Sequence, residues 1–341
     1  MSNLHLSLAC GPYDLLYALI EGEARASGID FNVTTRPSPE RHGRLLRHQE
    51  FDVCELSLGS YLVAREAGLP FTAIPVFPHR RFRHRYCVKR VGCGIEKPSD
   101  LNGRRVGLDT LQNSAGLWMR GILQDYYGVD LASIEWWCQE EEDVAFELAP
   151  WLRVKRVPPG GDIDRMLVAG ELDAAIYPDT LPSIRSGSPA VALLFPDPKQ
   201  AEIEHFRAGG HFPIMHTVVI RDSILERHPW VAVNVMQAFQ QSKELCYARL
   251  RNPRNTAYAW IDDAMREQER VMGKDPWPYG LRDNEKARRE FQAGRATFMR
   301  NWPYAYALAK RQGSDIRNRF AVAPLPAFEG GGTGGVLGGH N

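Results

Sequence analysis

The chain has 341 residues, of which 44% are hydrophobic and 24% are charged, so it can bury the core of one large or two ordinary globular domains. Its 42 Lys and Arg side chains nearly balance 41 Asp and Glu, and a formal net charge of +1 gives no field that would attract nucleic acid or a membrane surface. No apolar run approaches the ~20 residues needed to cross a bilayer, so we expect neither nucleic acid nor a membrane as a partner.

The N-terminus and the cysteines indicate a cytoplasmic protein. The chain enters a strand-like pattern at once, in which Leu4, Leu6 and Leu8 alternate with polar residues, so we expect no signal peptide. The six cysteines are scattered without a C-x-x-C pair. This spacing favours reduced thiols over a zinc site or a disulfide framework. The oligomeric state is left open by the sequence, and a homo-oligomer is compatible with it.

Strand and helix signals alternate along the first half of the chain. The first strand ends at Cys10-Gly11-Pro12, where turn-forming residues interrupt the alternation, and a later helix ends at Gly68. The elements predicted here are strands over 4–9 and 51–56 and helices over 13–21, 39–48 and 60–67.

The same alternation continues in the second half. The elements predicted here are strands over 105–108, 174–177 and 217–220 and helices over 115–127 and 162–169. Pro229 then opens a long amphipathic helix with Val235, Phe239, Leu245 and Cys246 on one face. Strands that alternate with helices predict the α/β fold class with mostly parallel sheets.

A basic cluster, His79–Arg85, follows the apolar run 71–78. Six of its seven residues can hold a proton, although the whole chain is nearly neutral. Guanidinium groups bind planar carboxylates with two hydrogen bonds at a time, so such a cluster at a strand end indicates a small polyanionic ligand. A solvated basic loop is the simpler alternative, and the cluster alone leaves it open.

Seven motifs resemble known proteins. KPSDLNGRRVG (residues 97–107) and LVAGELDAA (167–175) resemble the two-lobed type II periplasmic binding protein fold. Five others, in order between about Leu4 and about Asn284, resemble the 4,5-dihydroxyphthalate decarboxylase family. They are RHQEFDV (47–53), FPHRRFRH (77–84), RGILQD (120–125), FPIMH (212–216) and DPWPYG (275–280).

The resemblance implies a chemistry for this chain. The family's enzymes remove one carboxylate from 4,5-dihydroxyphthalate and give protocatechuate in a cleft between two lobes. The substrate, a small aromatic dicarboxylate, would need an anchor for the carboxylate it keeps and an acid and a base near the ring. We expect no metal and no other cofactor, because arginines surround His79 and His84 and the acidic run 140–143 fits a solvated loop.

The candidate site residues follow from the cluster and from the strand ends, where this fold class binds ligands. We predict that His84 and His216 handle the proton and that Arg80, Arg81 and Arg83 bind carboxylate, although not all three can point inward. The other predicted substrate-binding residues are Tyr13, Ser57, Ser60, Thr110, Ser114, Arg120 and Asp179. Several have a structural alternative: Ser57 and Ser60 can cap a helix, Ser114 can close a turn, Tyr13 can pack, Asp179 can form a turn, and His216 can be a buried histidine satisfied by backbone.

The expected domain organisation is discontinuous. Residues 1–84 and 217–284 would form lobe one, residues 85–216 lobe two, and residues 285–341 an atypical C-terminal segment. That segment resembles a fragment of a sugar-binding protein of an ABC importer, in which Trp302 matches a sugar-stacking position. We interpret it as a gene fusion or an assembly artefact. The alternative function is a non-catalytic binding protein for an aromatic acid or another small anion.

Overall fold

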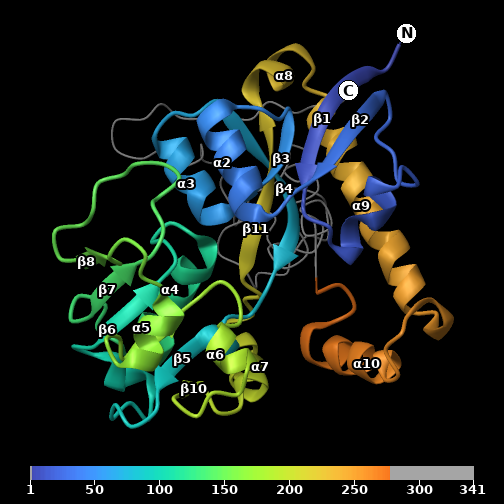
Figure 1. The fold of residues 1–341 in the computed structure, drawn as a ribbon. Coiled ribbons are helices and arrows are strands. Elements are labelled where there is room, and N and C mark those ends of the chain that lie inside the picture. Colours follow the sequence, from blue (N-terminus) through green and yellow to red (C-terminus); the bar gives the residue numbers. More distant parts are fainter. Residues whose placement is uncertain (1, 277–341) are drawn as a thin grey trace, which may run out of the picture. The chain divides into compact units, whose positions relative to one another are not determined.

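The computed structural model describes residues 2–276 (Figure 1). The chain divides into two compact units, residues 1–277 and 278–341, and every element described below belongs to the first. The predictions for the C-terminal segment, including the one for Trp302, lie outside the described residues. No helix in residues 2–276 is long and apolar enough to span a membrane.

The first sheet has five strands in the order β2-β1-β3-β11-β4. Strand β1 pairs in parallel with β2 and β3, whereas β11 runs antiparallel between β3 and β4. Its strands are β1 (Leu4–Cys10), β2 (Ile29–Thr35), β3 (Val53–Ser57), β4 (Phe71–Arg80) and β11 (Ile214–Arg221). The helices that accompany these strands in sequence are η1 (Asp14–Leu16), α1 (Tyr17–Ile20), α2 (Ser38–His48), α3 (Leu58–Glu66), α8 (Asp222–Arg227) and α9 (Val231–Leu250).

The second sheet has six strands in the order β10-β5-β9-β6-β7-β8. Its strands are β5 (Cys87–Arg90), β6 (Arg105–Leu108), β7 (Glu135–Cys138), β8 (Arg153–Arg156), β9 (Ala174–Ile176) and β10 (Val191–Leu193). The helices in this part are η2 (His84–Tyr86), η3 (Pro98–Leu101), α4 (Ser114–Tyr127), α5 (Ile163–Ala169), α6 (Pro182–Arg185) and α7 (Pro198–Gly209), and η4 (Pro253–Asn255) and α10 (Ile261–Met272) follow α9.

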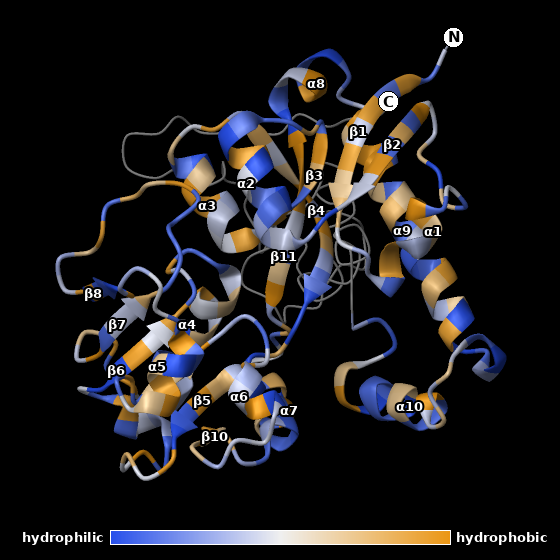
Figure 2. Cartoon of the chain, in the orientation of Figure 1, coloured by the Kyte–Doolittle hydropathy of each residue, from blue (hydrophilic) through white to orange (hydrophobic). Residues whose placement is uncertain are grey.

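The strands carry the apolar core. Every residue of β3 is buried, and Trp136 on β7 is fully enclosed in the core of the second sheet. Figure 2 shows the hydrophobic residues gathered on strands such as β3 and β5, whereas α10 mixes hydrophobic and hydrophilic residues. The predicted α/β class is confirmed, and five of the nine strand pairings are parallel.

The chain passes between the two sheets twice, after β4 and before β11, and these two crossings lie side by side. Arg80 is paired with Ile214, and the Arg81 N–H donates to the Pro213 carbonyl oxygen at 3.1 Å. The indole N–H of Trp118, on α4, donates to the Ile214 carbonyl oxygen at 2.8 Å. This arrangement supports the predicted division into two lobes, whose boundaries stay a prediction.

The starts of α3 and α4 also join the two sheets. The hydroxyl oxygens of Ser57 and Ser114 are 2.9 Å apart, and the Gly59 N–H donates to the Ser114 hydroxyl at 2.9 Å. A Cβ atom on Gly59 would lie 2.0 Å from the Gln112 carbonyl oxygen, so this approach of two backbones requires glycine.

The acidic run 140–143 is more than the solvated loop that we expected. The Glu142 carboxylate accepts hydrogen bonds from the backbone N–H groups of Leu111 (2.7 Å) and Gln112 (3.1 Å). Asp143 lies 3.7 Å from the Arg47 guanidinium on α2. Glu142 therefore binds the backbone of residues 111–112, and Asp143 lies near Arg47 on α2, a helix that accompanies the first sheet.

Candidate active site

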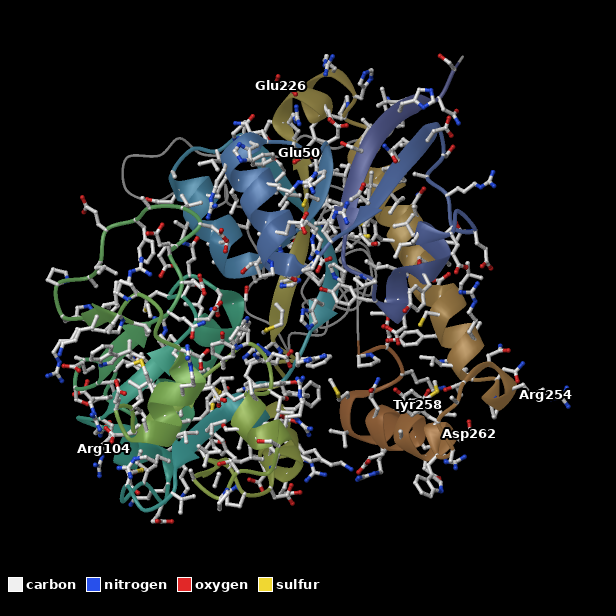
Figure 3. The ribbon with its side chains drawn as sticks, viewed as in Figure 1. Glu50, Arg104, Glu226, Arg254, Tyr258 and Asp262 are labelled. Carbon is white, nitrogen blue, oxygen red and sulfur yellow. The ribbon has the colours of Figure 1, made fainter. Side chains whose placement is uncertain are left out.

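A fully buried carboxylate, Glu55 on β3, is the centre of the most connected polar cluster in the first sheet. Charged side chains elsewhere, such as the labelled Glu226 and Asp262, project outward from the ribbon in Figure 3. Glu55 instead accepts hydrogen bonds from the Gly11 N–H (2.7 Å) and the Tyr13 hydroxyl (2.9 Å). Burying a charge is costly unless it is paired and hydrogen-bonded, as Glu55 is.

Arg41, on α2, supplies the opposite charge. Its Nη2 lies 3.0 Å from Glu55 Oε2, and its Nε donates to the Glu55 carbonyl oxygen at 3.2 Å. Burial alone would raise the pKa of Glu55, but the charges of Arg41 and then His216 hold that pKa well below its usual range. Burial and the Glu55 charge raise the pKa of the nearby Cys10 thiol to about 12. At neutral pH the carboxylate is therefore ionised and the thiol is protonated.

Three imidazole rings and one phenol ring surround this ion pair. The His216 ring lies edge-on to His42 and to His79, with ring centroids 5.1 Å and 4.8 Å apart. Tyr13 stacks on His79 at 5.3 Å. Burial, followed by the charge of His216, lowers the pKa of His79 to about 2 and the pKa of His42 well below its usual value. Both rings are therefore neutral.

His216 is hydrogen-bonded through Nδ1 to Glu55 Oε1. Because an ionised carboxylate can only accept, Nδ1 carries the hydrogen and donates it. Within residues 2–276, Nε2 has no partner, and the residue is 9% exposed. The carboxylate therefore orients the imidazole and leaves one nitrogen to exchange a proton.

The backbone explains why these residues meet. Gly11 and Tyr13 follow β1, and Glu55 lies near the end of the parallel strand β3. All three residues therefore lie at the carboxyl-terminal edge of these two strands. His216 is opposite Ser57 on one side and His79 on the other, with irregular register against β4 before and after it. Such irregularities re-aim side chains near functional sites.

Of the predicted site residues, Tyr13 and His216 lie in this cluster. Ser57 and Ser114 bond each other across the sheets, and Ser57 also caps α3 by accepting from the Ser60 N–H at 3.5 Å. The Thr110 hydroxyl accepts from a backbone N–H in its own turn. The buried Arg120 donates to the Leu111 carbonyl oxygen at 2.6 Å. The Ser57 contact matches its alternative of a helix cap, whereas Ser114 contacts Ser57 and Gly59 across the sheets.

The basic cluster separates into different environments. Arg80 donates to the Phe212 carbonyl oxygen at 3.4 Å, Arg81 is exposed and donates to the Tyr86 hydroxyl at 2.8 Å, and Arg83 is buried. Asp179 is exposed and accepts from the next backbone N–H at 2.7 Å, as in the turn alternative.

His84, the second candidate for proton handling, is enclosed in another place. Its ring is fully buried against Phe195 (4.9 Å), His205 (5.4 Å) and Tyr127 (6.0 Å). Burial lowers the pKa of His84 to about 4, so the ring is neutral at pH 7. These contacts favour His216 over His84 for proton exchange.

Arg41, His42 and the Glu55 carboxylate have no role predicted from the sequence. The usable signal was Glu55 itself, a charged residue within an otherwise apolar strand, because a buried carboxylate requires a partner. Nothing in the sequence points to Arg41 as that partner. Among residues 2–276 no group of three or more His, Cys, Asp or Glu side chains is placed to hold a metal ion, and all six cysteines are free.

Two proteins that are similar to this chain carry the name of a decarboxylase. No family model matches the chain. A 4,5-dihydroxyphthalate decarboxylase of Comamonas testosteroni is 36% identical over 293 residues, which cover 83% of this chain and 89% of that protein. A protein of the same name from Pseudomonas putida is 36% identical over 215 residues, which cover 61% and 83%.

A shorter similarity is of another kind. A probable ABC transporter-binding protein of Deinococcus radiodurans is 53% identical over 55 residues, 16% of this chain and 13% of that protein. The resemblance of one part of the chain to an ABC transporter-binding protein is thereby confirmed.

Two solved structures are similar to the chain at low identity. The periplasmic aliphatic sulphonate binding protein of Escherichia coli has a TM-score of 0.49 at 14% identity and covers 94% of this chain and 97% of its own. The alkanesulfonate-binding protein of Xanthomonas axonopodis pv. citri has a TM-score of 0.47 at 13% identity and covers 86% and 94%.

Proposed function

The chain belongs to the 4,5-dihydroxyphthalate decarboxylase family, and from this premise we propose that it removes one carboxylate from 4,5-dihydroxyphthalate or a related aromatic dicarboxylate. The reaction would take place beside the cluster of Glu55 and His216. The product from 4,5-dihydroxyphthalate would be protocatechuate. Two relatives that carry this name, together with the orientation of His216 by a buried carboxylate, support the proposal.

The chemistry requires a proton at the ring carbon that loses its carboxylate. The hydroxyl group para to that carbon pushes electron density toward it, and an acid delivers the proton there. The bond to the carboxylate then breaks, its electron pair returns to the ring, and carbon dioxide leaves. A base takes up the hydroxyl proton, so one group that cycles between acid and base can complete the reaction.

His216 is the group in the cluster that suits this task. Glu55 is held ionised by Arg41, and burial followed by the Glu55 charge raises the pKa of Tyr13 above its usual value, so Tyr13 stays protonated. His42 and His79 are held neutral. His216 remains, with Nδ1 fixed by Glu55 and Nε2 open. This observation carries the proposal.

The direct experiment incubates purified protein with 4,5-dihydroxyphthalate and follows protocatechuate and carbon dioxide. In His216→Gln we expect kcat to fall about 100-fold or more while substrate affinity stays within a few-fold, because an oriented general acid or base contributes on this scale. Glu55→Gln should also lower kcat, since the tautomer and orientation of the imidazole are then no longer fixed.

His84→Gln and His48→Gln are the controls. His84 is the other histidine that the sequence suggested, and His48 is exposed at the end of α2. Full turnover in His216→Gln, or a loss confined to His84→Gln, would contradict the assignment. Tight binding of 4,5-dihydroxyphthalate without any product would instead favour the alternative function, a non-catalytic binding protein for aromatic acids.

A further inference from the structure

Arg83 is a buried cation without an ion-pair partner among the described residues. The side chain is 2% exposed, and no ion pair to it occurs within the part of the chain that the structure describes. Its Nη2 donates to the Pro178 carbonyl oxygen at 2.9 Å, whereas Nε and Nη1 are buried and have no partner. Burial lowers the pKa of Arg83 to about 10, so the group is still charged at neutral pH.

Such an arrangement is costly, because unpaired charges and open donors in a protein interior lose the hydration of the unfolded chain. The guanidinium is held in place by the Tyr86 ring, whose centroid lies 4.6 Å from Cζ. One of the two hydrogens on Nη2 is donated to the Pro178 carbonyl oxygen. The other hydrogen, together with the hydrogen on Nε or one on Nη1, forms a pair of donors that can bind both oxygens of a carboxylate.

Arg83 is also within electrostatic range of the candidate active site. The positive charges of Arg81 and Arg83 contribute to the low pKa of His79, after burial and the charge of His216. The His79 ring in turn contacts the His216 ring at a centroid distance of 4.8 Å. Arg83 thus follows the strand β4 that carries His79, four residues after it, and its charge acts on the ring that contacts His216.

The neighbouring arginines lack this combination. Arg81 is exposed, Arg80 lies over the Phe77 ring and donates to a carbonyl oxygen, and Arg85 is exposed with its Nε 3.8 Å from Glu202. Burial, open donors and a fixed orientation occur together in Arg83.

We propose that Arg83 is the specificity-determining residue that anchors the carboxylate which the substrate keeps. The inference rests on the proposed function and makes it more specific, because the site then selects aromatic acids with a second carboxylate. The incoming carboxylate forms two hydrogen bonds with the guanidinium and neutralises its charge.

The test is calorimetric titration with phthalate, which has both carboxylates and lacks the hydroxyl groups that drive decarboxylation. In Arg83→Gln we expect phthalate affinity to fall about 30-fold to 1000-fold, the scale for removing one partner of a desolvated charge pair. Arg83→Lys should recover only part of it, because an ammonium group lacks the planar fork. Arg85→Gln, two residues away and exposed, is the matched control and should bind like the unaltered protein.

Thermal unfolding separates binding from structure. Because the buried guanidinium has two open donors and no ion-pair partner among the described residues, Arg83→Gln should have a Tm equal to or above that of the unaltered protein. A fall of several degrees together with lost affinity would show a structural role and overturn the proposal. Unchanged phthalate affinity in Arg83→Gln, or no phthalate binding by the unaltered protein, would overturn it as well.

These outcomes are independent of turnover. If the unaltered protein binds phthalate through Arg83 and yet forms no protocatechuate, the proposed function fails and the carboxylate anchor stands. If the protein forms protocatechuate and Arg83→Gln binds phthalate normally, the anchor fails and the function stands.

Discussion

At the scale of single residues, the buried histidines couple stability to pH. Burial lowers the pKa of His42, His79, His84 and His205, so these rings are neutral in the folded protein. In the unfolded chain each would take up a proton near pH 6.5. Their stabilising contribution is therefore complete above about pH 6.5 and is lost as the pH falls toward the folded-state values.

His84 allows this to be measured away from the candidate active site. Between about pH 6.5 and pH 4 its protonation in the unfolded chain should cost about 1.4 kcal/mol of unfolding free energy per pH unit. His84→Phe keeps a ring against Phe195 and cannot take up a proton, so its unfolding free energy should fall less steeply over this range. Denaturant titrations at several pH values measure the slopes. Slopes equal to those of the unaltered protein and of the exposed control His48→Phe would refute this explanation.

Part of the site was predictable at this scale. Tyr13 and His216 stand out because each lies beside an apolar strand pattern, where the strand ends or begins. Arg41 gave no such signal, because a helical arginine near an acidic residue is usually solvated. Its role depends on the burial of α2 against β3, which places the guanidinium on Glu55. Burial of this kind is a property of the fold and cannot be derived from spacing.

At the scale of elements, the central strands were easier to predict than the edges. Strand β3 is apolar apart from Glu55 and Ser57, whereas β8 is an edge strand of mostly charged residues without hydrophobic periodicity. The edge strand β2 alternates Ile29, Phe31 and Val33 with polar residues, so a strand signal was present there and was missed. The junction of α3 and α4 was likewise not predictable, because Gly59 reads as an ordinary residue in a helix start until Gln112 is placed against it.

Gly59 provides the test of that junction. In Gly59→Ala the new Cβ would meet the Gln112 carbonyl oxygen, so one backbone must shift, and we expect the unfolding free energy to fall by about 1–3 kcal/mol. Gly121→Ala, within α4, is the matched control. Nothing lies within 4 Å of its Cβ position, and alanine favours a helix, so its stability should rise by up to about 1 kcal/mol. Equal stability of both variants would mean that the junction tolerates a wider separation.

At the scale of the whole molecule, the two sheets should fold without the end of the chain. All strands of both sheets lie between residues 4 and 221. The segment 291–341 ends in a glycine-rich stretch, which can bury little apolar area against its conformational entropy. A protein truncated after residue 290 should therefore unfold cooperatively and keep its far-ultraviolet circular dichroism. Aggregation, or a much lower Tm, would show that the aromatic residues of 291–306 complete the fold.

The place of β11 in the first sheet has a consequence for biosynthesis. The first 80 residues contain four of the five strands, but β3 and β4 are neighbours of β11 and not of each other. A nascent chain cannot complete this sheet until residues 214–221 have left the ribosome, and until then β3 and β4 each have an unpaired edge. Glu55 is separated from His216 by 161 residues and from Arg41 by only 14. The guanidinium is thus available to neutralise the carboxylate long before the imidazole is synthesised, and the contact between Glu55 and His216 is among the last of the sheet to form.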